Sequence, residues 1–243
     1  MTGADTPLIE VIGIRKNYAG LRPLRIDNLI VRRGDQLALT GFDKDAAEAF
    51  VHLVTGAALP DEGDVRIAGK DTRAIATDTE WLASLDRFGI VTDRAVLVDR
   101  LSIASNLALP LTLTIDPMTA ETRQQVERLA ADADLPVKRL DDPASTLSAE
   151  ERVRVHFARA LAMNPALLIL EHPTGKLEDP AHSRAFGSTL RTVAARRGMG
   201  WIALTADDEF VRASAGTRLT LNAATGRLEG EGGFWRKLFG RPI

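Results

Sequence analysis

Apolar runs and amphipathic stretches follow one another along most of this chain. Continuous apolar runs of strand length fall at 37–39, 88–92, 166–170 and 201–204. The 3.6-residue spacing of amphipathic helices is found at 101–109, 119–133, 147–162 and 181–197. Such alternation of strands and helices predicts an α/β fold with a mainly parallel sheet, in which a ligand binds beside the carboxyl ends of the strands.

Three further regions depart from this alternation. Near the N-terminus, 8–14 and 24–31 alternate apolar and polar positions as strands do, and another strand is expected at 64–67. The stretch 95–143 is helical and carries turn residues, so it predicts a helical insertion between two parts of the sheet domain. The tail 232–243 is aromatic and basic. We expect it to fray or to pack on its own chain rather than to act as a small membrane anchor.

Composition narrows the class of protein. A chain of 243 residues suffices for one large α/β domain or two small ones. Its net charge of -2 provides no basic field for nucleic acid, and the lack of cysteine excludes disulfides and thiolate metal sites. No apolar run approaches a membrane span, and the first residues lack the features of a signal peptide. We therefore expect a cytoplasmic protein whose membrane contacts are peripheral.

The stretch 37–54 has the layout of a phosphate-binding loop: a buried strand, a tight loop opened by Gly41, and a helix expected to continue to Gly56. Compared with the pattern G-x-x-x-x-G-K-[ST], Gly41 holds the first position. Ala46, Ala47 and Glu48 replace the second glycine, the lysine and the Ser or Thr. By itself, this stretch predicts a junction between a strand and a helix and nothing more.

Acidic side chains gather at this junction. Asp43, Asp45 and Glu48 lie at or near the expected N-terminus of the helix, where the helix dipole favours negative charge and where they would repel a phosphate. Lys44 is the compensating cation, but it precedes the usual lysine by three positions, so its ammonium would leave from the wrong side of the loop.

Two later segments carry polar residues at structural boundaries. Ser148 is a natural N-cap for the helix at 147–162, and Glu151 lies three residues on, so the pair predicts a capping box. The apolar strand at 166–170 ends at Glu171 and His172. Both segments are expected at the edge of the sheet where ligands bind.

Taken in this order, the segments resemble the nucleotide-binding subunit of an ABC transporter, from residue 8 to about residue 222. Tyr18 falls where that family has an aromatic residue that stacks on adenine. Asp93 falls where it has a glutamine that ligates metal and faces the permease. The remaining motifs match by position: 147–151 stands on the signature LSGGQ, 167–174 on LLLLDEPT, 175–178 on the loop that contacts the other subunit, and 204–207 on the segment with Thr-His-Asp.

The resemblance implies an α/β fold: a P-loop NTPase core of ABC type with a mainly parallel sheet, an N-terminal antiparallel β subdomain and a helical insertion. It implies a single domain over 1–243, with the helical subdomain at about 95–158. The implied cofactors are ATP and magnesium. The implied partners are a membrane permease and a second nucleotide-binding subunit, in a homodimer or heterodimer, and nucleic acid is not among them. The implied location is peripheral, at the inner face of the cell membrane.

The resemblance also assigns site residues, although most of the chemical groups are replaced. The nucleotide-contacting positions are Tyr18, Gly41, Phe42, Asp43, Lys44, Asp45, Ala46, Ala47, Glu48, Asp93, Ser148, Ala149 and Glu151. The metal positions are Glu48, Asp93 and Glu171. Among the catalytic positions, Glu171 stands for the metal-bridging aspartate, His172 for the glutamate that polarises water and Ala206 for the switch histidine.

Three functions remain open at this point. The first is a degenerate ABC subunit that keeps the fold and the permease-coupling surface but has largely lost ATP hydrolysis. Such a subunit would act as the structural or regulatory partner of a competent ATPase or of a second copy of itself. The second is an active ATPase with altered chemistry, in which His172 acts as the base, Glu48 and Glu171 hold a metal and Lys44 contacts phosphate. The third is a soluble binding module that uses the nucleotide cleft for another ligand.

Overall fold

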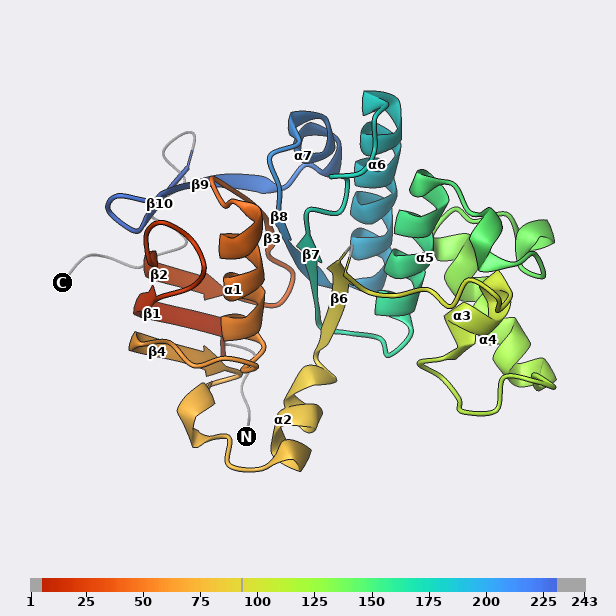
Figure 1. Ribbon diagram of the computed structural model, residues 1–243, viewed down its shortest axis with the longest axis horizontal. Coiled ribbons are helices and arrows are strands. Elements are labelled where there is room, and N and C mark those ends of the chain that lie inside the picture. The colour runs from red at the N-terminus through yellow and green to blue at the C-terminus, as the bar shows by residue number, and fades with distance from the viewer. Residues whose placement is uncertain (1–5, 93, 231–243) are drawn as a thin grey trace.

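The computed structural model describes residues 6–92 and 94–230, and two β-sheets form its scaffold (Figure 1). Among these residues the larger sheet has six strands in the order β10-β9-β3-β8-β7-β6. They are β3 (Gln36–Thr40), β6 (Phe88–Thr92), β7 (Leu167–Glu171), β8 (Gly200–Leu204), β9 (Thr217–Asn222) and β10 (Arg227–Gly230). Neighbouring strands run parallel except for β10, which is antiparallel to β9. The predicted α/β fold with a mainly parallel sheet is confirmed.

The second sheet comes from the N-terminal part of the chain and is antiparallel. Within the described residues it has four strands in the order β2-β1-β4-β5, namely β1 (Ile9–Lys16), β2 (Leu24–Val31), β4 (Glu62–Ile67) and β5 (Lys70–Asp71). Ile9 of β1 pairs with Val31 on one side and with Ile67 on the other. All three side chains are buried, as the alternation of apolar and polar positions predicts. The antiparallel N-terminal subdomain is therefore confirmed.

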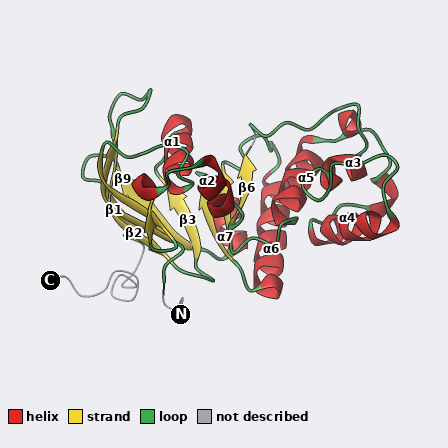
Figure 2. Ribbon diagram, turned by 90° about the horizontal axis from the view of Figure 1, so that it is seen from below, coloured by secondary structure: helices red, strands yellow, loops and turns green. Residues whose placement is uncertain are grey.

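Helices cover the larger sheet and make up the end of the molecule remote from β1 and β2 (Figures 1 and 2). They are α1 (Lys44–Val54), α2 (Asp78–Leu85), α3 (Ile103–Ala108), α4 (Ala120–Asp132), α5 (Ala149–Leu161), α6 (Pro180–Arg197) and α7 (Asp208–Ser214). Short 3-10 turns lie at Thr72–Ala74, Val137–Arg139 and Ala144–Thr146. Helices α3, α4 and α5 lie together. The first two fall within the helical insertion predicted at 95–143, and α5 follows it and continues to Leu161, past the bound of about 158 predicted for the helical subdomain.

Both faces of the larger sheet are buried. On one face, Phe50 and Leu53 of α1 pack with the strands of the second sheet and with β3. On the other face, the rings of Phe157, Phe186 and Phe210 pack in series, with centroids 5.4 and 5.8 Å apart. Burial of each such ring contributes roughly 1.5–3 kcal/mol. Because helices hold the sheet from both sides, the carboxyl ends of its strands form a fixed platform.

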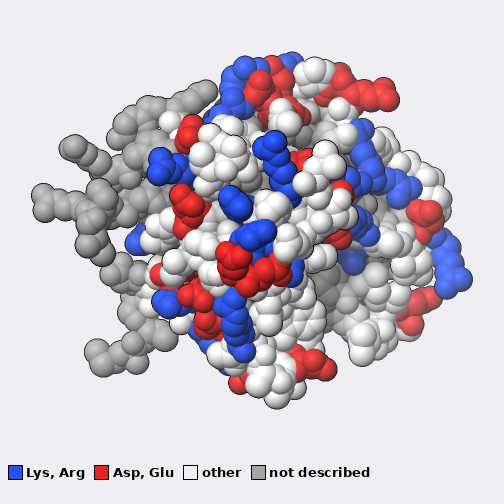
Figure 3. All heavy atoms as spheres, turned by 60° about the vertical axis from the view of Figure 1, so that its left-hand side comes forward, with Lys and Arg blue, Asp and Glu red and all other residues white. Residues whose placement is uncertain are grey.

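Charged side chains of both signs are interspersed on the surface shown in Figure 3. This mixture agrees with the small net charge of the chain, which is -2. Ion pairs connect elements that are distant in sequence, for example Arg15 with Glu62 at 3.0 Å and Arg184 with Glu209 at 3.0 Å. Because these pairs are exposed, each contributes little to stability, roughly 0–1 kcal/mol.

Candidate functional site

The candidate site lies where the parallel strands β3, β8, β7 and β6 reach their carboxyl ends. The strand register places Thr92 beside Glu171, and Glu171 beside Leu204. Gly41, His172 and Ala206 follow directly after β3, β7 and β8, or one residue later. The parallel topology therefore brings together residues from four separate parts of the sequence, as expected at this edge.

Gly41 opens the loop between β3 and α1 in a backbone conformation that requires glycine. Its φ angle is +84°, and a Cβ at this position would lie 2.7 Å from the main-chain oxygen of Leu221. The loop ends quickly, because α1 begins at Lys44. Residues 44–46, which belong to the glycine-rich loop in the phosphate-binding motif, form the first turn of the helix here.

Asp43 is the N-cap of α1. Its carboxylate accepts a hydrogen bond of 2.7 Å from the main-chain N–H of Ala46. The N-terminus of a helix attracts anions because its first N–H groups lack partners within the helix. In this chain a carboxylate of the protein itself satisfies one of those groups and places negative charge where a phosphate would bind.

The positions of the missing glycine and lysine contribute to the core. Ala46 is 5% exposed and Ala47 is fully buried, and both belong to the cluster that packs α1 against the strands. Phe42 is also buried, with its ring 5.6 Å from that of Phe50 in an edge-to-face arrangement. These three side chains therefore face the interior of the protein rather than a phosphate group.

Arg94 joins two of the predicted metal positions. Its guanidinium pairs with Glu48 of α1, and through its second amino group with Glu171 at 2.5 Å. The end of β6 helps to hold this arginine, because the side-chain oxygen of Thr92 accepts a hydrogen bond of 3.2 Å from the main-chain N–H of Arg94. Glu171 is 1% exposed, whereas Glu48 is partly exposed. The cation that neutralises both carboxylates thus belongs to the chain.

Arg94 is not among the site residues predicted from the sequence. Glu48 and Glu171 both belong to the carboxyl edge of the larger sheet. Their negative charges need a cation nearby. Position 94 directly follows the strand β6 at the same edge. That combination of charge and topology was the available signal.

The described side chains do not fit a magnesium ion between Glu48 and Glu171, since Arg94 pairs with both carboxylates. Over 6–92 and 94–230, no group of three or more His, Cys, Asp or Glu side chains is arranged to hold a metal. The predicted third ligand, Asp93, lies outside the described residues. The assignment of Glu48, Asp93 and Glu171 to a metal therefore stays a prediction.

His172 adopts an unusual backbone conformation immediately after β7. Its φ angle is +42°, in the left-handed region that non-glycine residues rarely occupy. Its N–H donates to the main-chain oxygen of Leu204 at 2.9 Å, whereas its Nε2 atom is buried without a hydrogen-bond partner among the described residues. Strain of this kind and an unsatisfied nitrogen are features that cluster at functional sites.

The position of the switch histidine carries no functional side chain here, because Ala206 is a small exposed residue. The next residue, Asp207, caps α7 by accepting from the N–H groups of Glu209 and Phe210. It also accepts a hydrogen bond of 2.7 Å from the Thr174 hydroxyl. Burial raises the pKa of Asp207, but hydrogen bonds from Ser183, Thr174 and the helix N–H groups outweigh it and lower the pKa overall.

Tyr18 lies beside the acidic junction, as its predicted role requires. It lines a cavity of about 250 Å³ together with Asp45, Glu48 and His52. Burial first, and then the charges of Asp43 and Asp45, raise the pKa of its phenol. The structure therefore brings the predicted adenine-stacking residue next to the loop, in surroundings that are acidic.

The signature segment forms the predicted capping box at the N-terminus of α5. The Ser148 hydroxyl accepts from the N–H of Glu151 at 3.2 Å, and the Glu151 carboxylate accepts from the N–H of Ser148 at 2.9 Å. Glu151 also pairs with Arg139. Ser148 and Ala149 are exposed, so this end of α5 is accessible.

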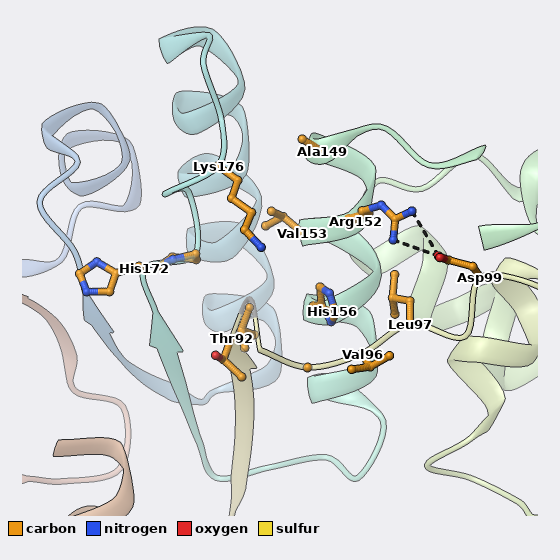
Figure 4. Close-up of a pocket in the computed structure, with 13 residues that line it drawn as sticks. Thr92, Val96, Leu97, Asp99, Ala149, Arg152, Val153, His156, His172 and Lys176 are labelled. Atoms are coloured by element: carbon orange, nitrogen blue, oxygen red, sulfur yellow. Dashed lines mark hydrogen bonds and ion pairs between the residues drawn. The ribbon is translucent and has the colours of Figure 1, made fainter. Parts of the chain in front are cut away.

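A larger cavity of about 330 Å³ separates the signature helix from the end of β7 (Figure 4). Its walls include Ala149 of α5, His172 and Lys176. Arg152 and Asp99 form an ion pair of 3.3 Å at one side, and the ring of His172 points away from α5 (Figure 4). The cavity therefore adjoins both the signature segment and the end of β7.

Comparison with known proteins defines the class of this protein. The ABC transporter family matches residues 48–175, and the chain belongs to this family. The chain has the P-loop fold of the family's ATP-binding domains. The TM-score is 0.76 to CbiO1 of Clostridium perfringens, which is part of the ABC transporter complex CbiONQ. It is 0.74 to MJ0796, a dimeric bacterial ABC transporter cassette. Sequence identity to each is 23%; the matches cover 94% and 93% of this chain, and 89% and 100% of those chains.

Curated relatives include the methionine import ATP-binding protein MetN of Rhizobium etli, which is 28% identical over 239 residues, covering 98% of this chain and 64% of MetN. The macrolide export ATP-binding/permease protein MacB 1 of Aeromonas hydrophila is 27% identical over 188 residues, covering 74% of this chain and 28% of MacB 1. The chain thus spans less than two thirds of the length of these relatives. Over its described residues, none of its helices has the length and apolar character needed to span a bilayer.

Proposed function

We propose that this chain is a degenerate ATP-binding subunit of an ABC transport complex, in which the fold is kept and ATP hydrolysis is largely lost. The observation that carries the proposal is the junction of β3 and α1. There Ala47, a buried core residue, takes the position of the phosphate-binding lysine. The carboxylate of Asp43 caps the helix where a phosphate would otherwise bind.

Phosphoryl transfer depends almost entirely on positioning and on stabilisation of charge by lysine and magnesium. Each such contact typically contributes on the order of 3–4 kcal/mol to transition-state stabilisation. Replacement of the lysine by Ala47, and pairing of Glu48 and Glu171 with Arg94, remove several contacts at once. We therefore expect hydrolysis to be slower by several orders of magnitude than in a site that keeps these groups.

In this proposal the subunit acts as a structural or regulatory partner of a permease, of a competent ATPase, or of both, at the inner face of the membrane. The exposed N-terminus of α5 supports such a role, because the family binds nucleotide between the loop of one subunit and the signature of the other. Ser148 would face ATP held by the partner. A homodimer and a heterodimer are both compatible with this arrangement.

The test is calorimetric titration of the purified chain with ATP, with and without magnesium. We expect no heat of binding up to millimolar ATP under either condition. Affinity purification from membranes should then recover a permease or a second ATP-binding subunit. Magnesium-dependent binding at micromolar ATP would refute the loss of nucleotide binding, and recovery of the chain free of both partners would refute the transport role.

One observation favours a second function, an ATPase with altered chemistry. The strained backbone of His172, and its Nε2 atom without a hydrogen-bond partner in the part of the chain that the structure describes, are compatible with a role as general base. Turnover that disappears in both His172→Ala and Glu171→Gln would support this alternative, and turnover that neither substitution changes would remove it.

A further inference from the structure

We propose that Arg94 is a built-in cation that takes the place of magnesium in this site. Its guanidinium bridges Glu48 and Glu171, so the chain binds no divalent cation there. The inference deepens the proposed function and rests on it for the identity of the site, because the family places its metal ligands at these two positions.

Two carboxylates occupy the metal positions of this site. In P-loop proteins a Ser or Thr of the loop and an aspartate after a central strand hold the magnesium ion. Glu48 and Glu171 occupy these positions, and both carry longer side chains ending in a carboxylate. Their oxygens are hard ligands of the kind that magnesium prefers. Without a cation between them, the two negative charges would repel each other at the edge of the sheet.

The guanidinium of Arg94 lies between these two carboxylates. Arg94 contacts Glu48 through one terminal amino group and Glu171 through the other. This fork geometry suits a bridging role, since the planar group presents several donors in fixed directions. Thr92 accepts from the main-chain N–H of Arg94 and lies within 3.4 Å of its Nε atom, so the stem is held at both ends. A metal and this side chain cannot occupy the same place.

Glu171 is buried. Its side chain is 1% exposed, and its second oxygen has no hydrogen-bond partner among the described residues. A buried carboxylate needs a partner of opposite charge, so Arg94 is required for the folded chain rather than incidental to it. Removal of Arg94 should therefore both destabilise the protein and expose a vacant pair of carboxylates to cations in solution.

The experiment compares the full-length chain with Arg94→Met, which removes the charge and keeps an apolar stem. Manganese binding is measured by electron paramagnetic resonance in the absence of nucleotide, and the melting temperature is measured with and without manganese. We expect no bound manganese in the wild type. The variant should melt several degrees lower, bind about one manganese ion, and recover most of its melting temperature when manganese is added.

Arg123→Met is the matched control, because Arg123 also bridges two carboxylates, those of Glu127 and Asp141. Both of these are exposed, so this variant should gain no manganese and change little in melting temperature. Adding Glu171→Gln to Arg94→Met should abolish the new manganese site. These two variants separate a specific site from binding to exposed acidic side chains in general.

Two results would overturn the inference. The first is that the wild type binds manganese and that Glu48→Gln and Glu171→Gln abolish this binding. The second is that Arg94→Met folds but binds no manganese. If Arg94→Met does not fold, Arg94→Gln keeps a hydrogen-bond donor towards Glu171 and takes its place in the same measurement.

The outcome of this experiment is separate from the test of the proposed function. A failure to gain manganese would leave the absence of ATP binding intact, and recovery of a permease says nothing about Arg94.

Discussion

Two helix N-termini at the same face of the molecule have kept different amounts of their family's chemistry. At α5, Ser148 stands at its family position, caps the helix and remains exposed. At α1, the lysine and the metal-binding hydroxyl are gone, the cap is a carboxylate, and Ala47 is part of the core. Under the proposed function, the end of α5 that would face a partner's nucleotide keeps its serine, although Ala149 and Glu150 replace the two glycines of the signature. The end of α1 that would hold the chain's own nucleotide has a structural role instead.

The largest expected effect comes from restoring the family's lysine. Ala47→Lys should lower the free energy of unfolding by about 3 kcal/mol or more, since it forces a charged side chain into a fully buried position. Ala149→Lys is the matched substitution at the exposed start of α5 and should cost about 1 kcal/mol or less. Urea unfolding of both variants checks the difference, and equal costs at the two helices would contradict the packing seen at α1.

A smaller effect is expected from the caps. Asp43→Ala and Ser148→Ala each remove an N-cap and should each cost about 1 kcal/mol of stability. Asp43→Ser keeps a capping oxygen and should stay within about 0.5 kcal/mol of the wild type. Thermal unfolding measures these changes. If Asp43→Ser cost as much as Asp43→Ala, the carboxylate would have a role at α1 beyond capping.

The smallest effect concerns the ionisation of Tyr18, the single tyrosine of the chain. Burial and the charges of Asp43 and Asp45 raise its pKa, so its tyrosinate absorbance should appear above pH 10, and later in pH than in the unfolded chain. Because the folded pKa is raised, the associated stability is complete below about pH 10 and is lost as pH rises through the folded value.

Asp45→Asn should move this absorbance change to lower pH, towards the value for the unfolded chain. Asp78→Asn, at the start of the exposed helix α2, serves as the control and should leave it in place. An unchanged titration in Asp45→Asn would mean that Asp45 does not contribute, and that burial and the charge of Asp43 raise the pKa.

The strands and the large helices could be predicted because their information is local. The alternating segment at 24–31 and the apolar run at 88–92 coincide with β2 and β6. Helix α2 was not predicted, and none of its residues is buried, so it lacks the apolar stripe on which such a prediction depends. The edge strand β10 and its neighbour β9 were also missed. Helix α1 starts at Lys44, inside the segment expected to form a loop, because Asp43 caps it there.

The positions of the site residues followed from the parallel topology, but their contacts did not. Motif order placed Gly41 and Glu171 at one edge of the sheet, as the structure has them. The bridge from Arg94 to Glu48 and Glu171 depends on the reach of side chains across three separate elements. The two acidic positions and the arginine after β6 indicate that a cation lies at this edge, but motifs alone do not show that Arg94 reaches both Glu48 and Glu171. Asp93 and the tail 232–243 lie outside the described residues, and the predictions made for them remain as stated.

The bridge formed by Arg94 has a consequence for the cell in which this chain works. A cation that is covalently part of the protein has a local concentration fixed by geometry, whereas a metal ion must be drawn from a pool that rises and falls. Chelation or a shortage of magnesium would empty an ordinary site of this family and leave Glu48 and Glu171 neutralised here. The subunit would thus hold one conformation at this edge through changes in metal and energy supply, and so offer a constant surface to the partner that we propose.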